Sequence, residues 1–277
     1  MTESNTLLLA SDLSARSDRP TDRALLLADQ LSSSVLLLHV VEDQEANEEQ
    51  LKERVRAALD SVAGEKAHSV DVVVRRGRVD REILTLAEEC SPALIVTGVA
   101  RFNSIRDYIL GTAVDHLVRH APAPVLVVKR RAREPYRRLL VATDFSECSA
   151  RALRTAAALF PEAEITVWHS CHAAYEAYLN AEQTVIALQL EADREMKRFV
   201  ESAALPEETR ARLVQRVEVG RDLWSQAEKA VRDGAFDLFV LGTHGQSGGA
   251  QATIGSRAAE LLHLIDCDMP MLRAPTR

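Results

Sequence analysis

The chain has 277 residues, of which 47% are apolar and 27% charged, and a formal charge of −7. This acidic balance argues against general nucleic-acid binding, which depends on Lys and Arg neutralising phosphates. No apolar run reaches the roughly 18 residues that a membrane-spanning helix needs, and no basic segment precedes the first apolar run, so we expect neither a membrane helix nor a signal peptide. Four cysteines without CxxC or zinc spacing predict reduced thiols in a cytoplasmic protein.

Apolar runs of strand length alternate with helical patterns in the first half. Continuous apolar runs such as the one at residues 35–41 are typical of strands buried on both faces of a parallel sheet. Alternating strands and helices predict right-handed crossovers and an open parallel sheet. We expect strands at residues 6–10, 35–41, 70–74, 93–97 and 125–128, and helices at 23–31, 42–64, 81–89 and 111–119.

The same pattern restarts in the second half. Asp144, Phe145 and Ser146 repeat Asp12, Leu13 and Ser14, and His169 repeats His39. The sequence therefore predicts a duplicated α/β domain, with domains at residues 1–131 and 136–277, five parallel strands in each and helices on both faces. The second set of strands is expected at residues 137–143, 165–169, 215–219, 238–242 and 269–272.

Two segments of the chain lie outside this repeat. A basic stretch between the domains reads as a solvated linker rather than a binding patch. The second domain is longer by an amphipathic segment at 175–204, for which packing against its own sheet is favoured over a partner surface. The basic stretch contains Arg130, Arg131, Arg133, Arg137 and Arg138.

Residues 241–258 combine a buried strand, a glycine-bearing loop and the start of a helix. Gly242, Gly245, Gly255 and Ser256 have the spacing G-x2-G-x9-G-S. Glycines let a backbone approach a ligand, and the unpaired amides at a helix N-terminus carry partial positive charge. This stretch therefore predicts an anion site.

Polar residues at other strand ends are weaker candidates. Asp144 follows the first strand of the second half, on the edge of the sheet where ligands bind, and its carboxylate suits ribose hydroxyls or Mg²⁺. The alternative is a helix N-cap, with Ser146 as a rival capping residue. His39 and His169 end core strands and are interpreted as structural. His244 either donates to a phosphate or has no ligand role.

With the spaced glycine motif on its strand, the chain resembles a tandem universal stress protein over nearly its whole length. The resemblance implies an adenine nucleotide alpha hydrolase-like fold, pairing of the two domains through their last strands, and ATP binding in the second domain, with AMP or ADP as alternatives and Mg²⁺ accompanying the nucleotide. A homodimer of chains remains open. The implied nucleotide-binding residues are Ala142, Thr143, Asp144, Ser170, Leu241, Gly242, His244, Gly245, Gly255, Ser256 and Arg257.

The first half departs from this pattern at one position of the loop. Gly98, Gly111 and Thr112 are in place, and Asp12 remains at the end of the first strand, but Arg101 occupies the position of the middle glycine. A side chain there fills space that a phosphate needs, although its guanidinium could instead pair with one. We expect nucleotide binding to be lost or altered in this half.

The motifs favour holding a nucleotide over consuming it. The chain has no G-x4-G-K-[ST] loop and no G-x-S-x-G elbow, and residues 242–256 contain no lysine, arginine or acidic residue to support phosphoryl transfer. The leading hypothesis is a cytoplasmic ATP-binding protein of the stress response without catalytic residues; slow hydrolysis stays open. The alternative is a scaffold or sensor with vestigial sites that binds another small ligand or a protein.

Overall fold

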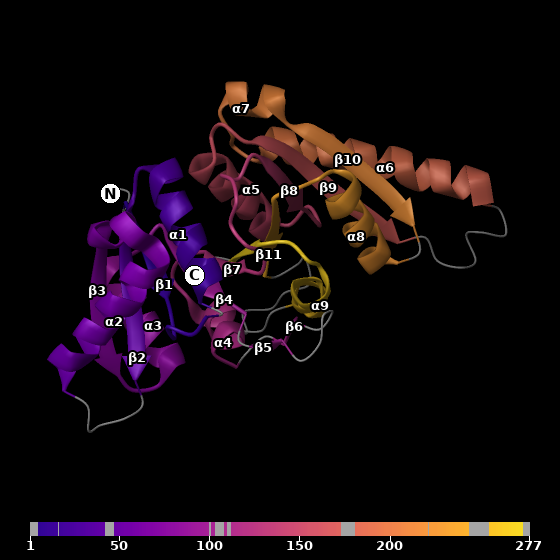
Figure 1. Ribbon diagram of the computed structural model, residues 1–277. Coiled ribbons are helices and arrows are strands. Elements are labelled where there is room, and N and C mark those ends of the chain that lie inside the picture. Colours follow the sequence, from indigo (N-terminus) through magenta and orange to yellow (C-terminus); the bar gives the residue numbers. More distant parts are fainter. Residues whose placement is uncertain are drawn as a thin grey trace. The chain divides into compact units, whose positions relative to one another are not determined.

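The computed structural model describes residues 5–15, 17–41, 47–99, 101–102, 108–109, 112–172, 181–220, 222–243 and 255–273. The chain divides into two compact units. Unit 1 comprises Met1–Pro135 with Asp268–Arg273, and unit 2 is built on Tyr136–Cys267. Each unit is an α/β structure around an aliphatic sheet, which confirms the expected fold class (Figure 1).

Unit 1 contains a sheet in the order β12-β7-β4-β1-β2-β3, in which all neighbours except β12 and β7 run parallel. Helices α1 and α2 contact each other, as do α3 and α4. The elements are β1 (Thr6–Ala10), α1 (Asp18–Leu31), β2 (Ser34–Val41), α2 (Glu48–Ala63), the 3-10 helix η1 (Gly64–Ser69), β3 (Val70–Arg76), α3 (Val79–Cys90), β4 (Leu94–Gly98), α4 (Thr112–His120), β7 (Val125–Val128) and β12 (Met269–Leu272).

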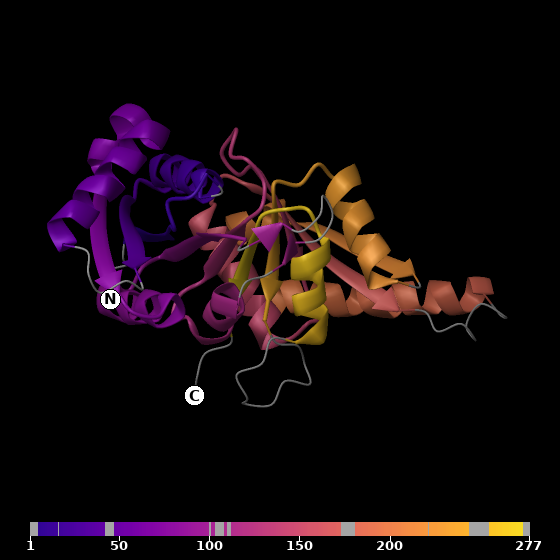
Figure 2. The same cartoon turned by 60° about the horizontal axis from the view of Figure 1, so that its bottom comes forward.

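Unit 2 contains four parallel strands in the order β10-β9-β8-β11. Helices α6 and α8 lie on opposite faces of this sheet (Figures 1 and 2). The elements are β8 (Arg138–Ala142), α5 (Glu147–Leu159), β9 (Glu164–His172), α6 (Ala181–Ser202), α7 (Glu207–Arg212), β10 (Val214–Gly220), α8 (Leu223–Asp233), β11 (Leu238–Gly242) and α9 (Ser256–Leu264).

The strand expected at residues 269–272 has the predicted bounds but belongs to unit 1. It forms β12 and pairs antiparallel with β7, so that Met269 lies opposite Val127 and Met271 opposite Val125. The described part of unit 2 therefore has four strands of its own rather than five.

The cores follow from the apolar runs. Leu7, Leu8 and Leu9 of β1 have no exposed surface, and neither have Leu238 and Phe239 of β11. Strands that are apolar at successive positions bury side chains on both faces, which requires helices on each side of the sheet. The parallel order then brings the carboxyl ends of β8, β9 and β11 to one edge of unit 2.

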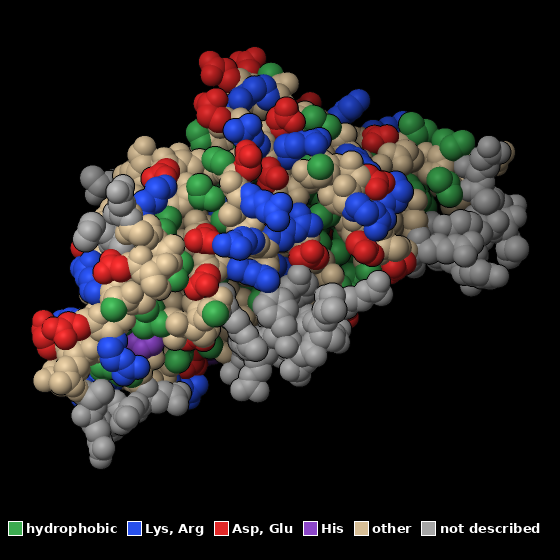
Figure 3. Space-filling model, viewed as in Figure 1, with side chains coloured by type: hydrophobic (Ala, Val, Ile, Leu, Met, Phe, Trp, Pro, Cys, Tyr) green, Lys and Arg blue, Asp and Glu red, His purple; other side chains and the backbone are tan. Residues whose placement is uncertain are grey.

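Charged side chains of unit 2 are mixed in sign at its surface. Acidic and basic groups lie side by side over β10 and α8 (Figure 3), where Arg216 pairs with Glu218 and Lys229 with Asp233. No helix in the described part of the chain is both long and apolar enough to cross a membrane.

Candidate functional site

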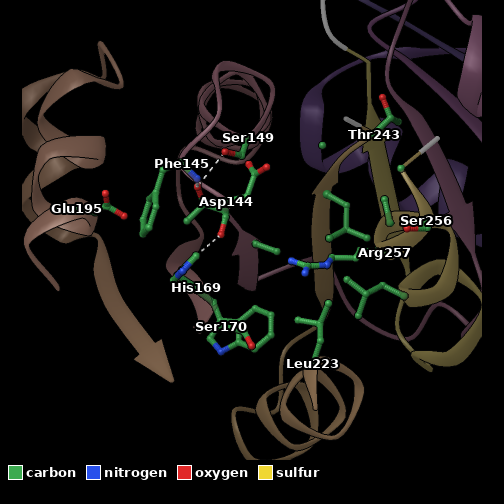
Figure 4. Close-up of a pocket in the computed structure, with 18 residues that line it drawn as sticks. Asp144, Phe145, Ser149, His169, Ser170, Glu195, Leu223, Thr243, Ser256 and Arg257 are labelled. Carbon is green, nitrogen blue, oxygen red and sulfur yellow. Dashed lines mark hydrogen bonds between the residues drawn. The ribbon is translucent and has the colours of Figure 1, made fainter. Parts of the chain in front are cut away.

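Unit 2 contains a cavity of about 710 Å³ at the carboxyl ends of β8, β9 and β11. Helices α6 and α8 supply Glu195 and Leu223, and α9 supplies its first turn (Figure 4). Nine residues expected from the sequence line it, namely Ala142, Thr143, Asp144, Ser170, Leu241, Gly242, Gly255, Ser256 and Arg257. His244 and Gly245 lie outside the described residues.

The loop after β8 is held in a left-handed turn. Phe145 has φ 65°, which is costly for a residue with a side chain. Two contacts hold it there: its backbone N–H donates to Thr143 Oγ1 over 2.9 Å, and its ring stacks on His169 with centroids 4.2 Å apart. This turn leaves Asp144 on the cavity wall (Figure 4).

The hydrogen bonds of this loop decide which residue caps α5, a question that the sequence left open. Ser146 is the N-cap of α5 and accepts from the backbone N–H of Ser149 over 3.3 Å, while Asp144 Oδ1 accepts from the N–H of Ser146 over 3.1 Å. His169 Nδ1 lies 2.7 Å from the carbonyl oxygen of Thr143 and orders the loop, as expected for a structural histidine. These contacts give Ser146 and His169 structural roles.

The end of β11 approaches α5 closely at Gly242. A Cβ at this position would lie 3.0 Å from Cys148 Sγ and 3.3 Å from the backbone nitrogen of Ser149. A side chain at this position would crowd α5, whether or not a ligand is present. Gly255 lies beside the end of β11, because its N–H donates to the carbonyl oxygen of Thr243 over 2.8 Å.

Helix α9 begins directly after Gly255, and its N-terminus, which carries partial positive charge, faces the cavity. Its first turn has no acidic residue and its N-cap, Gly255, provides no side-chain cap. Arg257 extends from α9 across the cavity toward the β8–β9 side (Figure 4). The unpaired amides at a helix N-terminus and a guanidinium both favour an anion.

The opposite wall carries acceptors. Asp144 follows β8, and Glu195 projects from α6 beyond the Phe145 ring (Figure 4). The cavity therefore has carboxylates on the β8–α6 side and the N-terminus of α9 on the other side, and the guanidinium of Arg257 reaches from α9 into the space between them. Sequence reasoning missed Glu195 and Leu223 because α6 and α8 carry no motif that points to the cavity.

The corresponding positions of unit 1 are arranged differently. Arg101 lies in a short antiparallel ladder, β5 (Arg101–Phe102) with β6 (Tyr108–Ile109), where Arg101 is opposite Ile109. Gly98 ends β4 and Thr112 begins α4, while Gly111 lies outside the described residues. Burial acts to raise the pKa of Asp12, but hydrogen bonds to its carboxylate from Ser17 Oγ and from the N–H of Ser14 together outweigh burial and lower the pKa.

Metal and thiol chemistry find little support in the described residues. Across these ranges, no group of three or more His, Cys, Asp or Glu side chains could hold a metal ion. All four cysteines are free thiols. Burial raises the pKa of the Cys171 thiol, and Glu195 adds to the effect, so this thiol stays protonated at neutral pH.

A duplicated parallel-sheet unit with a cavity at its carboxyl edge places the chain among the tandem α/β proteins. Residues 3–129 and 135–273 each match the universal stress protein family, and the chain belongs to that family. The comparison with curated proteins gives no match.

Solved structures show the same fold along the whole chain. One is a universal stress protein from Archaeoglobus fulgidus DSM 4304, 17% identical with a TM-score of 0.68, the alignment covering 98% of each chain. Another, from Pseudomonas aeruginosa UCBPP-PA14 and assigned to the same family, is 17% identical with a TM-score of 0.67, covering 97% of this chain and 93% of the other.

Proposed function

We propose that unit 2 binds an adenine nucleotide, ATP in the first instance, and that the protein acts as a nucleotide-dependent regulator of the stress response in the cytoplasm. The observation that carries the proposal is the division of the cavity. Carboxylates on one wall suit a sugar with hydroxyl donors, and the α9 N-terminus with Arg257 suits phosphates.

The dimensions and the backbone suit such a ligand. A cavity of about 710 Å³ lies within the range of roughly 300–1,000 Å³ that is typical of small-molecule sites. In this arrangement Asp144 accepts from ribose hydroxyls and Ser170 lies beside the base. Gly242, Gly255, Ser256 and Arg257 surround the phosphates, together with His244 and Gly245. Mg²⁺ would accompany the phosphates, with Asp144 as its one protein carboxylate, because this ion retains several waters.

Binding rather than turnover is the proposed activity. The loop from Gly242 to Ser256 contains no lysine, arginine or carboxylate that could orient an attacking water, and Arg257, just beyond it, is suited to hold an anion and not to act as a base. His169 and Ser146 are occupied with the loop and the α5 cap. A nucleotide held without hydrolysis serves as a signal or a structural ligand.

Calorimetric titration of the full chain with ATP, ADP and AMP tests the proposal. Arg257→Ala removes a charge-assisted contact to phosphate, a type of interaction worth roughly 1.5–3 kcal/mol, so affinity is expected to fall about tenfold or more. Gly245→Arg copies the residue at the matching position of the first half and is expected to abolish binding. Arg212→Ala on α7 is the matched control, because Arg212 does not line the cavity.

The alternative, a scaffold with vestigial sites, predicts different results. In that case wild type gives no saturable heat with any adenine nucleotide, and mass spectrometry of molecules released by heating finds none. ATP affinity that is unchanged in both Arg257→Ala and Gly245→Arg would also contradict the proposal.

A further inference from the structure

Strand β10 forms an open edge of unit 2. Among the strands that the structure describes it pairs with β9 alone, and none of its seven residues is buried. It contains no proline that would keep another strand away, and an unpaired strand of this length is a template for pairing with a second chain. The nucleotide proposal makes no use of this edge, because no residue of β10 lines the cavity.

The sequence of β10 is complementary to itself when two copies run antiparallel. The strand reads VQRVEVG, with Val217 at its centre. In an antiparallel pair centred on Val217, Arg216 lies directly opposite Glu218 of the second copy, and Glu218 lies opposite Arg216 of that copy. The exposed side chain of Val214 then lies opposite Gly220, which has room for it. Opposite charges at facing positions stabilise an antiparallel pair.

The two charged side chains already lie together at the surface. Arg216 pairs with Glu218 along the strand, as alternate residues on one face of a strand can, and both side chains are partly exposed. When two copies pair, the four charged groups alternate in sign around the centre of the contact. Each carboxylate then has a guanidinium beside it along its own strand and another one opposite.

Helix α6 carries an apolar flank on the side of this edge. Ile186 and Leu190 are 54% and 53% exposed. Each lies nine residues before a side chain that faces the β8 side of the helix, namely Glu195 at the cavity and Phe199 against Phe145. Nine residues are about two and a half helical turns, so Ile186 and Leu190 lie on the opposite side of α6, away from β8 and toward β10.

A hydrogen bond shows how α6 and β10 are aligned along their length. Gln189 Nε2 donates to the carbonyl oxygen of Val217 over 3.4 Å, so the centre of β10 is level with the apolar flank of α6. Helix α6 contacts both β9 and β10. If two β10 strands pair about 4.8 Å apart, two such helices lie roughly 10 Å apart on one face of the joined sheet, which is the usual spacing of packed helices. Ile186 and Leu190 then meet the same two residues of the second copy.

We propose that two copies of the chain associate through β10 and α6, with a two-fold axis that passes through Val217. The sheet of unit 2 continues from one copy into the other, and each residue of the contact meets the same surface on the second copy. The order of Arg216 and Glu218 and the apolar flank of α6 lie on different elements, yet both require this one axis.

Sedimentation velocity of the full chain over a concentration series tests the proposal. Wild type is expected to form a dimer. Arg216→Glu and Glu218→Arg each place like charges opposite one another twice, so each is expected to raise the dissociation constant of the dimer at least about tenfold. The double variant with both changes restores the alternation of charge and should dimerise as wild type does. An equimolar mixture of the two single variants should form a mixed dimer, because every facing pair is then opposite in charge.

The flank of α6 is tested separately. Leu190→Lys brings two like charges together beside the axis and should weaken the dimer at least about tenfold. Leu264→Lys on α9 is the matched control, because Leu264 is 54% exposed and lies outside the proposed contact.

Circular dichroism shows whether each variant is folded; should a charge variant unfold, Leu190→Lys and its control decide alone. The proposal is overturned if wild type is a monomer throughout the series. It is also overturned if the folded single charge variants dimerise as wild type does, if their mixture does not associate, or if Leu264→Lys weakens the dimer as much as Leu190→Lys.

Discussion

Gly242 shows how one residue serves packing and ligand access together. The 3.0 Å approach of an added methyl group to Cys148 Sγ would be relieved only by moving α5 away from β11, because backbone atoms of Cys148 and Ser149 also lie at 3.3 Å. The lack of room for a side chain at Gly242 therefore shapes both the wall of the cavity and the packing of the core.

Gly242→Ala is expected to destabilise the protein by about 1–3 kcal/mol, the range for overpacking a closed core. Gly255→Ala is the matched control. Its Cβ would meet only the Thr243 carbonyl oxygen at an ordinary 3.5 Å. A poorer N-cap and a less flexible unfolded chain offset each other there, so a change below about 1 kcal/mol is expected. Urea unfolding measures both; equal losses would show that the α5 contact is unimportant.

Site residues that follow from local sequence could be predicted, and those brought in by tertiary packing could not. Gly242, Gly255 and Asp144 sit at strand and helix ends, where the local pattern marks the ligand edge. Glu195 lies in the middle of a long helix, and its place on the cavity depends on how α6 crosses β9 and β10. Nothing in its neighbours along the chain carries that information.

The N-terminus of helix α8 is stabilised by a side-chain cap. Asp222 is the N-cap, and its carboxylate accepts from the backbone N–H groups of Trp224 and Ser225. The bond from Ser225 lowers the pKa of Asp222, outweighing the opposing effect of burial. Because Leu223, the first residue of α8, lines the cavity, this cap also helps to fix one wall of the site.

Asp222→Ala should cost about 1 kcal/mol at pH 7, as the loss of an N-cap generally does. A lowered folded-state pKa means that the stabilisation is present above the unfolded value, near 4, and is lost as the pH falls through the folded value. The difference in the free energy of unfolding between wild type and Asp222→Ala should therefore become smaller below about pH 4. Asp222→Asn keeps the cap without the charge. Urea unfolding at several pH values measures this difference. A difference that stays constant with pH would contradict a role for the charge of Asp222.

Elements were predictable where apolar runs were continuous and bounded. The bounds of β7, β11 and β12 agree with the sequence prediction, because each run is flanked by turn-forming or polar residues. Helix α1 begins at Asp18 rather than at residue 23, since Pro20 is tolerated in a first helical turn. The ladder of β5 and β6 was missed because two-residue strands carry no periodicity.

At the scale of the whole chain, the last strand belongs to the first unit. Asp268, just before β12, is fully buried, and its Oδ1 accepts from the backbone N–H groups of Lys129 and Arg130 over 2.7 and 2.8 Å. Its Oδ2 lies 3.4 Å from Arg23 Nε, also buried. Pairing with β12 also covers β7, whose four residues are all buried. The repeat pattern by itself predicts the strand but not its partner. The resemblance to the tandem family implied that the last strands of the two halves pair, and the pairing of β12 with β7 agrees with that expectation.

Asp268→Ala should therefore destabilise unit 1 although it lies near the other end of the chain. It leaves the Arg23 charge buried without its carboxylate, a change that generally costs about 3–5 kcal/mol. Asp268→Asn keeps an acceptor for the two N–H groups and should reduce the stability of unit 1 by less. Comparing the two variants separates the contribution of the ion pair with Arg23 from that of the two hydrogen bonds. Hydrogen exchange resolved by segment is the measurement. Protection should fall in α1, β4 and β7 and persist in β8 and β9; unchanged protection of β7, or equal losses in both units, would show that the C-terminal strand does not stabilise unit 1.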